Sequence, residues 1–300
     1  MIHRFPYWMR AVPFFLSALF FLSALFSVFA PLPLIFLYQR DSGKWFMLAV
    51  LTNLLIVSGL SGWFSAALFG VFVLPVAIFL PKFLFEKHYS VNRSVGFTLL
   101  IMLILLVLMI GAYGVFKQVN PVTDLHAQFS VFVDQLITAA KDAGTDWAND
   151  KPPEILKHDI LVELPSAVAV FALIMTWANL VLLARLSPKD RFKTLGLDLN
   201  YFRQWKAPEF LLWPTIAAGA LLVFGNGWIF DLGLNVFKFL MAIFAIQGIS
   251  ILSFLFDRWK IQGFFRSAAY LLVVFLMMPL LLAVGFFDQW FDFRAKLRQS

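Results

Sequence analysis

The stretch VGFTLLIMLILLVLMIGAYGVF (residues 95–116) contains no charged side chain, and as a helix it is long enough to cross the hydrocarbon core of a membrane. Comparable apolar runs recur throughout the 300-residue chain, which is 61% hydrophobic and only 14% charged. Soluble domains are about 45–50% apolar and about 25% charged. Because a globular core could not bury this much apolar surface, the sequence predicts a polytopic membrane protein.

The apolar runs predict an all-α fold, because they are long and unbroken and lack the period-two alternation of a membrane barrel. A further run, 31–38, is too short to cross alone as a regular helix. The first thirty residues resemble a signal peptide, with Arg4 and Arg10 before the apolar run, but cleavage after Ala30 would leave Pro31 first, so we expect an uncleaved first helix. The prediction is one integral membrane domain over residues 1–300, with one short broken segment and about eight transmembrane helices: 11–30, 45–60, 63–80, 95–116, 161–184, 210–224, 232–256 and 268–287.

The distribution of Lys and Arg predicts an orientation. If 31–38 crosses as a broken helix and the N-terminus is cytoplasmic, the basic loops fall inside and the acid-rich stretch 117–159 falls outside. The positive-inside rule favours this arrangement over its reverse, and we expect a protein of the bacterial cytoplasmic (inner) membrane. The tail FRAKLRQS would then end outside, unless the final run, broken at Pro279, folds back. Both arrangements of the tail stay open.

The stretch 117–159 is predicted to be an extracytoplasmic amphipathic insertion. Asn120 and Pro121 are typical of a helix cap and first turn, and Gly144 is typical of a helix end. Apolar residues recur between them at helical spacing: Leu125, Phe129, Phe132 and Leu136. The helix could lie as a lid over a binding site, or it could be a surface helix that covers the ends of the bundle.

Few side chains in the apolar runs could carry chemistry. Lys238 could extend toward the membrane surface along its aliphatic stem, or it could relay protons with a partner carboxylate. Neutral polar and aromatic groups are more plentiful. They could bind a solute, although hydrogen bonding between helices explains each one singly. The candidate substrate-binding residues are Asn53, Trp177, Asn179 and Gln247.

Two groups of residues could contact a partner. The small residues Ser23, Ser27 and Ala30 could let another helix approach the first run closely, either inside the bundle or from a second protein. Arg203 and Lys206 could contact lipid headgroups or a protein. The expected partners are the lipid bilayer and a membrane protein or a second copy of the chain.

Enzyme signatures are absent from the sequence. The chain has no Cys, its four His lie outside the apolar runs, and it contains no HExxH or phosphate-binding loop. We therefore expect no catalytic residue, no metal and no cofactor. The net charge of +7 is explained by basic cytoplasmic loops rather than by nucleic-acid binding.

The C-terminal third carries the segments FRQWKAPEFLLWP, DLGLNVFKFLMAIFAIQGISILSFLFDRW and GFFDQWFDFR. On these segments the chain resembles the YybS-like family of predicted bacterial membrane proteins, a domain of unknown function. The resemblance covers most of the chain. It implies a distant similarity to the substrate-binding components of energy-coupling-factor transporters, and PLPLIFLYQRDSGKW near the N-terminus fits that similarity. The small residues of the first run do not reproduce an Ala-x-x-x-Ala docking motif, and the resemblance implies no specific ligand.

The leading hypothesis is a membrane protein that binds or transports a small, largely apolar solute, with or without an energising partner. The alternative is a non-transporting scaffold or assembly partner for other envelope proteins. Glu209, which follows Pro208 at the head of an apolar run, is interpreted as a helix start rather than as a cation or proton site.

Overall fold

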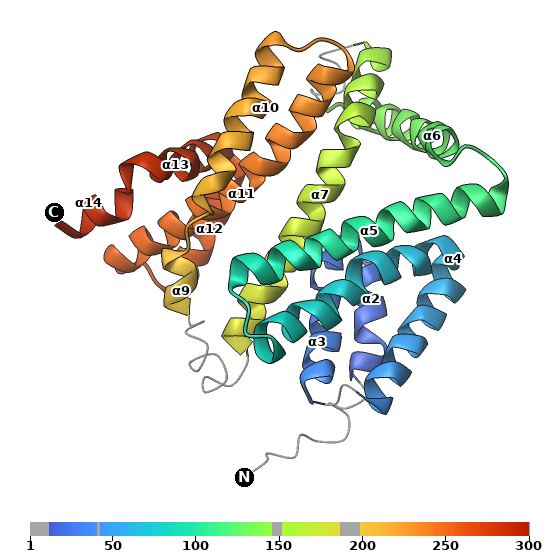
Figure 1. Ribbon diagram of the computed structural model, residues 1–300, viewed down its shortest axis with the longest axis horizontal. Helices are drawn as coiled ribbons and strands as arrows, with labels where there is room; N and C mark the ends of the chain where they lie inside the picture. Colours follow the sequence, from blue (N-terminus) through green and yellow to red (C-terminus); the bar gives the residue numbers. More distant parts are fainter. Residues whose placement is uncertain (1–11, 41–42, 146–151, 187–198, 300) are drawn as a thin grey trace. The chain divides into compact units, whose positions relative to one another are not determined.

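The computed structural model describes residues 12–40, 43–145, 152–186 and 199–299, and every regular element within these ranges is a helix (Figure 1). The predicted all-α class is confirmed for this part of the chain. The chain divides into two compact units. Unit 1 comprises Met1–Leu125 and Phe171–Pro188, and unit 2 comprises His126–Val170 and Lys189–Ser300. The prediction of a single membrane domain is not tested by this division.

Unit 1 is built around a long bent helix, α4 (Lys44–Pro81), which continues into a π-helical turn, η3 (Lys82–Glu86). At Gly62 the backbone is not helical, with φ 86° and ψ 168°, and two helical arms are joined across a kink at this residue. The ribbon of α4 is bent (Figure 1). The two arms correspond to the predicted runs 45–60 and 63–80. Helices α3 (Pro31–Arg40) and α5 (Val91–Lys117) pack against α4.

The N-terminal run is not one continuous helix, contrary to the prediction for residues 11–30. It comprises a 3₁₀ turn, η1 (Val12–Phe14), a seven-residue helix, α2 (Leu16–Leu22), and a second turn, η2 (Ser27–Phe29). Ser23 has extended geometry and ends α2. The Ser17 hydroxyl donates to the Ala30 carbonyl at 2.6 Å, so the chain turns back on itself. The predicted short segment 31–38 is the ten-residue helix α3.

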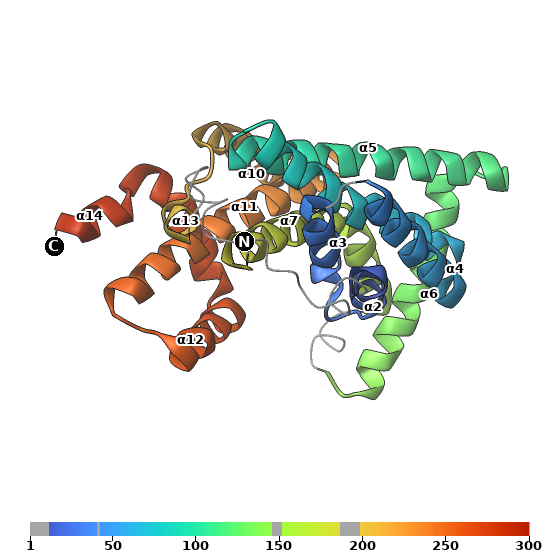
Figure 2. The ribbon, with the colours of Figure 1, turned by 90° about the horizontal axis from the view of Figure 1, so that it is seen from below.

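Unit 2 is organised around α11 (Trp228–Arg258), which packs against α10 (Leu212–Phe224) and α13 (Met278–Phe291). Two short elements precede α10, namely α9 (Leu199–Gln204) and the 3₁₀ turn η5 (Glu209–Leu211). Helix α12 (Gly263–Leu276) meets α13 at an angle of 92°, and α14 (Phe293–Gln299) follows (Figure 1, Figure 2). Close approach of α13 to α11 requires glycine, because a Cβ at Gly248 or Gly285 would collide with backbone of the facing helix.

Two helices contribute to both units. Helix α6 (Pro121–Asp142) follows α5, and α7 (Pro153–Leu186) carries the next apolar run. The predicted start and end of α6 are confirmed. The Asn120 side chain accepts from the N–H groups of Val122 and Thr123, and Gly144 has φ +68°.

The predicted number of eight transmembrane helices is not confirmed. Four described helices are long and apolar enough to cross a membrane: Lys44–Glu86, Val91–Lys117, Pro153–Leu186 and Trp228–Arg258. The bent pair α12–α13 makes a fifth if it is counted as one span. The difference arises where runs are interrupted. The break in 11–30 leaves only short helices, Glu209–Phe224 falls in a shorter class, and 45–60 and 63–80 belong to one bent helix.

Candidate functional site

The chain leaves the helical state between α9 and η5, over residues 205–208. Pro208 has φ −56° and ψ 130°, and a proline disfavours helical geometry in the residue before it. Trp205 and Ala207 are buried, with 6% and 2% of their surface exposed. Because the backbone of this stretch lacks both helical partners and solvent, its N–H and C=O groups need other partners.

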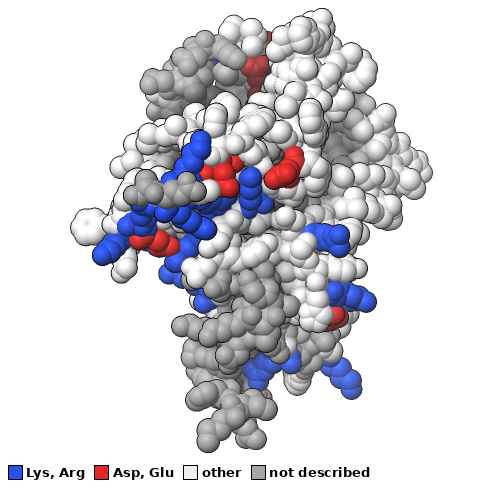
Figure 3. All heavy atoms as spheres, turned by 60° about the vertical axis from the view of Figure 1, so that its left-hand side comes forward, with Lys and Arg blue, Asp and Glu red and all other residues white. Residues whose placement is uncertain are grey.

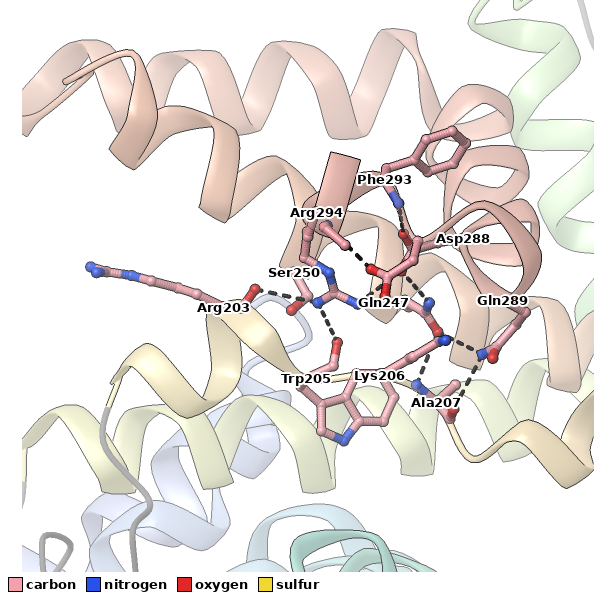
Figure 4. A network of polar contacts seen from close by, with 12 residues as sticks. Arg203, Trp205, Lys206, Ala207, Gln247, Ser250, Asp288, Gln289, Phe293 and Arg294 are labelled. Atoms are coloured by element: carbon pink, nitrogen blue, oxygen red, sulfur yellow. Dashed lines mark hydrogen bonds and ion pairs between the residues drawn. The ribbon is translucent and has the colours of Figure 1, made fainter. Parts of the chain in front are cut away.

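Side chains from α11, α13 and α14 satisfy this backbone (Figure 4). The Ala207 N–H donates to Gln247 Oε1 at 2.9 Å, and Gln289 Nε2 donates to the Ala207 carbonyl at 3.1 Å. Arg294 Nη1 donates to the Trp205 carbonyl at 2.9 Å. The Ser250 hydroxyl donates to the Phe202 carbonyl. We call this set the C-terminal clamp: Gln247, Ser250, Asp288, Gln289 and Arg294.

A buried ion pair lies at the centre of the C-terminal clamp. Arg294 Nη2 donates to Asp288 Oδ2 at 2.8 Å, and their side chains are 6% and 0% exposed. Asp288 also accepts from Gln247 Nε2 and from the Phe293 N–H, each at 2.8 Å. Buried charges persist only when they are paired and hydrogen-bonded, as they are here. Because these contacts join the helices to the 205–208 backbone, the clamp is suited to holding structure rather than to moving a proton.

Helix α7 lacks one of its own backbone hydrogen bonds next to Pro165, and the Asn235 side chain of α11 replaces it. We call this place the repaired break of α7. Pro165 lies inside that helix and has no N–H to donate. The Ser166 N–H donates to Asn235 Oδ1 at 2.8 Å, and Asn235 Nδ2 donates to the Val162 carbonyl at 2.9 Å. In an uninterrupted helix Ser166 would bond to Val162 directly. The Asn235 amide therefore lies between the Ser166 N–H and the Val162 carbonyl and forms a hydrogen bond with each of them.

Two amides of unit 1 hold the irregular N-terminal segment in the same way. Asn53 Oδ1 accepts from the Ala18 N–H at 2.6 Å, and its Nδ2 donates to the Pro13 carbonyl at 2.9 Å. Asn179 Nδ2 donates to the Val28 carbonyl at 2.7 Å. Both side chains are fully buried. The Asn179 Oδ1 atom has no hydrogen-bond partner among the described residues, so this acceptor stays available to a polar group.

A groove of about 620 Å³ lies between α6, α7 and α11 in unit 2, and we call it the α6 groove. Its apolar lining comes from Leu161, Val162 and Pro165 of α7 and Leu232 of α11. Polar and ionisable side chains line the rest, among them His126, Ser130, Glu154, His158 and Asp231. Asn235, which repairs the α7 break, also contributes to the wall. An apolar surface with a few polar groups is typical of small-molecule sites.

Ion pairs stand beside the α6 groove. Lys157, which also lines it, contacts Asp134 of α6 at 2.6 Å. Lys238 of α11 contacts Glu163 of α7 at 2.5 Å, and both side chains are about two-fifths exposed, at 38% and 42%. Lys238 therefore has a carboxylate partner, which the sequence did not indicate, since only Asp231 lies near it in the chain. Partly exposed pairs of this kind contribute only about 0–1 kcal/mol.

Basic side chains gather at one end of unit 2, where α9, the end of α11, and α14 meet. Asp257 of α11 contacts Arg203 Nη1 at 2.7 Å and also pairs with Arg266. Arg258 donates to the Leu297 carbonyl, which ties α14 to this end. In Figure 3, Lys and Arg cluster around a few acidic side chains. The tail therefore lies beside the basic end of α11, and both arrangements of the tail relative to the membrane stay predictions.

The candidate substrate-binding residues are divided between the two units. Asn53, Trp177 and Asn179 belong to unit 1, and Gln247 belongs to unit 2. Asn53 and Asn179 contact the same N-terminal segment, Trp177 is half-buried, and none of the four lines the α6 groove. Their role in binding a solute stays a prediction.

The residues proposed to contact a partner are also dispersed. Ser23 ends α2, Ser27 lies in η2, and Ala30 is fully buried, so the three do not share one helix face. Arg203 and Lys206 lie at the basic end, each with a 31% exposed side chain and an acidic partner, Asp257 and Glu209 respectively.

Glu209 begins the 3₁₀ turn that leads into α10, which confirms its interpretation as a helix start. Its side chain is 83% exposed and lies 3.8 Å from Lys206. Pro208 precedes this turn instead of occupying its first position, in contrast to the prediction.

Sequence reasoning missed the Asp288–Arg294 pair and Asn235. The predicted run 268–287 ends one residue before Asp288, although GFFDQWFDFR holds both members of the pair. Pro165 inside a long run was the available signal for a repaired break. Within the described parts of the chain, no three His, Asp or Glu side chains could together hold a metal ion.

Comparison with known proteins identifies the family but not a relative of known structure. No curated protein and no solved structure matches the chain. The YybS-like description and the distant similarity to energy-coupling-factor components lie outside what the family match shows, and they stay predictions. A family model described as a predicted membrane protein, DUF2232, matches residues 11–289. The chain therefore belongs to the DUF2232 family of predicted membrane proteins.

Proposed function

We propose that the protein binds a small, largely apolar solute in the α6 groove and moves it through the membrane together with an energising partner. The observation that carries this proposal is the groove itself, which lies beside α6 and has an apolar lining with ionisable groups. Its volume of about 620 Å³ falls within the roughly 300–1,000 Å³ common for small-molecule pockets.

The arrangement of α6 supports a lid. His126 and Ser130 of α6 line the groove, and α6 is held to α7 by the Lys157–Asp134 pair. The ion pair is weak because it is partly exposed. The buried side chains Val133 and Ile137 also hold α6 against α7, so opening of the lid would have to expose them. The same helix was predicted from sequence to be either a lid or a surface cover, and the groove favours the lid.

The repaired break in α7 lies in the groove wall. Pro165 and Asn235 both line it, and the helix there depends on a side chain of α11 for one hydrogen bond. Interrupted helices near a binding site are common in transporters, because they turn helix ends and freed backbone groups toward the ligand. Movement of α7 relative to α11 would thus be coupled to the shape of the groove.

The proposed function includes an orientation in the membrane and a source of energy. The basic end of unit 2 faces the cytoplasm of a bacterial inner membrane, which places α6 and the groove outside. The N-terminus, also expected in the cytoplasm, lies outside the described residues. We propose no enzymatic activity, and the chain contains no phosphate-binding loop, so energy would come from a partner.

Native mass spectrometry of protein purified in mild detergent tests the proposal. We expect a bound small molecule on the wild-type protein. Leu232→Trp would narrow the groove and lower the occupancy of that molecule. Leu280→Trp is the matched control on α13, because Leu280 and Leu232 are 51% and 50% exposed. A wild-type protein without any bound molecule, or equal occupancy in the two variants, would contradict the proposal.

A scaffold without transport is the second candidate. It is favoured by the basic end, where several cationic side chains lie together around few acidic ones (Figure 3). Arg203 and Lys206 are the residues proposed to contact another envelope protein. Affinity purification in mild detergent would recover a stoichiometric partner if this alternative holds, and a chain recovered alone would argue against it.

A further inference from the structure

Helix α6 has two apolar stripes, and within the described parts of the chain only one of them is buried. Val133 and Ile137, each 3% exposed, pack against Leu156 of α7, with Ile160 and Leu161 beside them. A second stripe is formed by Phe129, Phe132 and Leu136, which are 37%, 58% and 44% exposed. These three belong to the face that the sequence predicted to be apolar, so that face points away from α7.

The two stripes are neighbours on the helix. With about 100° between successive residues, the exposed stripe is centred about 90° from the buried one. The polar residues Asp134, Gln135 and Thr138 lie on the remaining side. The apolar sector of α6 is therefore wider than the part that α7 covers, and a second apolar environment must meet the rest.

The start of α6 is fixed to the end of α5, a candidate membrane span. The Tyr113 hydroxyl of α5 donates to Asp124 Oδ2 of α6 at 2.5 Å, and a Cβ at Gly114 would lie 2.7 Å from Pro121. The last turn of α5 carries two open apolar side chains, Val115 at 81% and Phe116 at 93% exposed, directly before the basic Lys117 that ends the helix. Because α5 would meet lipid up to that turn, α6 begins at the level where the hydrocarbon ends.

We propose that the stripe Phe129, Phe132 and Leu136 is immersed in the membrane at the boundary between headgroups and acyl chains. Helix α6 would thus contact the protein on one side and lipid on the adjacent side. A protein occupant fits less well. Three side chains, even at about 150–250 Å² for an aromatic residue, offer less than the roughly 800 Å² that each partner contributes to a stable interface.

The chain has no cysteine, so single-cysteine variants can be labelled without further changes. Phe132→Cys reports on the exposed stripe, Gln135→Cys on the polar side and Ile137→Cys on the buried stripe. Each full-length variant would carry a nitroxide and be reconstituted into phosphatidylcholine vesicles containing phosphatidylglycerol. Power saturation then compares collisions with oxygen, which dissolves in lipid, and with a water-soluble nickel chelate.

We expect the label at 132 to collide with oxygen and to be shielded from nickel, whereas the label at 135 meets nickel and the label at 137 meets neither. Phe129→Cys should behave like Phe132→Cys. Agreement between these two variants would show that the result does not come from a local disturbance in one of them. Nickel access at 132 equal to that at 135 would place the stripe in water and overturn the proposal. Shielding of 132 from both reagents would overturn it in favour of a protein partner or a second copy.

Discussion

Replacing Arg294 by Met removes the cation of the C-terminal clamp while keeping much of its aliphatic volume. Asp288, which is 0% exposed, would keep the Gln247 amide and the Phe293 N–H but would lose its only charged partner among the described residues. The Trp205 carbonyl would lose its donor at 2.9 Å. The substitution therefore leaves one buried charge uncompensated and removes the Arg294 donor from one buried acceptor.

The expected cost follows from these two losses. Breaking a buried ion pair from one side costs about 3–5 kcal/mol. An unpaired buried carbonyl by itself costs about 1–3 kcal/mol. Because the two effects overlap, we expect Arg294→Met to lower the free energy of unfolding by about 4 kcal/mol. The double variant with Asp288→Leu should lose less than the sum of the single variants, by about 1–3 kcal/mol.

Equilibrium unfolding in detergent micelles measures these differences through the fluorescence of the 10 Trp residues. Arg298→Met is the matched control, because Arg298 lies on the same short helix but is exposed, with its guanidinium 5.6 Å from the Phe254 ring. Such a contact contributes about 0.5–1 kcal/mol. A loss for Arg294→Met no larger than that of the control would refute the assignment of Arg294 to a buried clamp.

Three further outcomes are expected. Gly285→Ala should lower the free energy of unfolding by about 1–3 kcal/mol or more in the same assay, because its Cβ would collide with the α11 backbone. The control is Gly111→Ala, whose Cβ meets no atom within 4 Å. This change should raise the free energy of unfolding by up to about 1 kcal/mol. Asn235→Leu should cost about 1–3 kcal/mol for each end of the α7 hydrogen bond left unpaired, and a wild-type stability would mean that the break needs no repair. In spheroplasts, a membrane-impermeant maleimide should label Gln135→Cys at once and Lys260→Cys only after lysis, and the reverse order would invert the proposed orientation.

The features that the sequence could predict are local in the chain. Composition and long apolar runs identify the membrane class. The bounds of α6 follow from Asn120, whose side chain caps the first turn, and from Gly144, whose positive φ ends the helix. Both effects act within a few residues of the chain. The apolar pattern of α6 was also visible. A pattern alone, however, did not tell which of its two stripes packs against α7 and which stays exposed.

The features that were missed are pairings between distant segments. Ser166 and Asn235 are 69 residues apart in the chain, and Gln247 and Asp288 are 41 apart. One sequence lists candidate polar residues but contains no information on which of them meet. For the same reason, the sequence suggests Asn53 and Gln247 as ligand-binding groups. The structure shows that Asn53 bonds to the Pro13 carbonyl and Gln247 to the Ala207 N–H, both of which lie outside α-helices.

The central claim is that the α6 groove holds a solute, and a cryo-electron microscopy map of the wild-type protein in lipid nanodiscs tests it most directly. The account predicts an open groove between α6, α7 and α11 that contains density not explained by protein, next to Leu232 and Pro165. A map in which side chains of these three helices fill the space completely would contradict it.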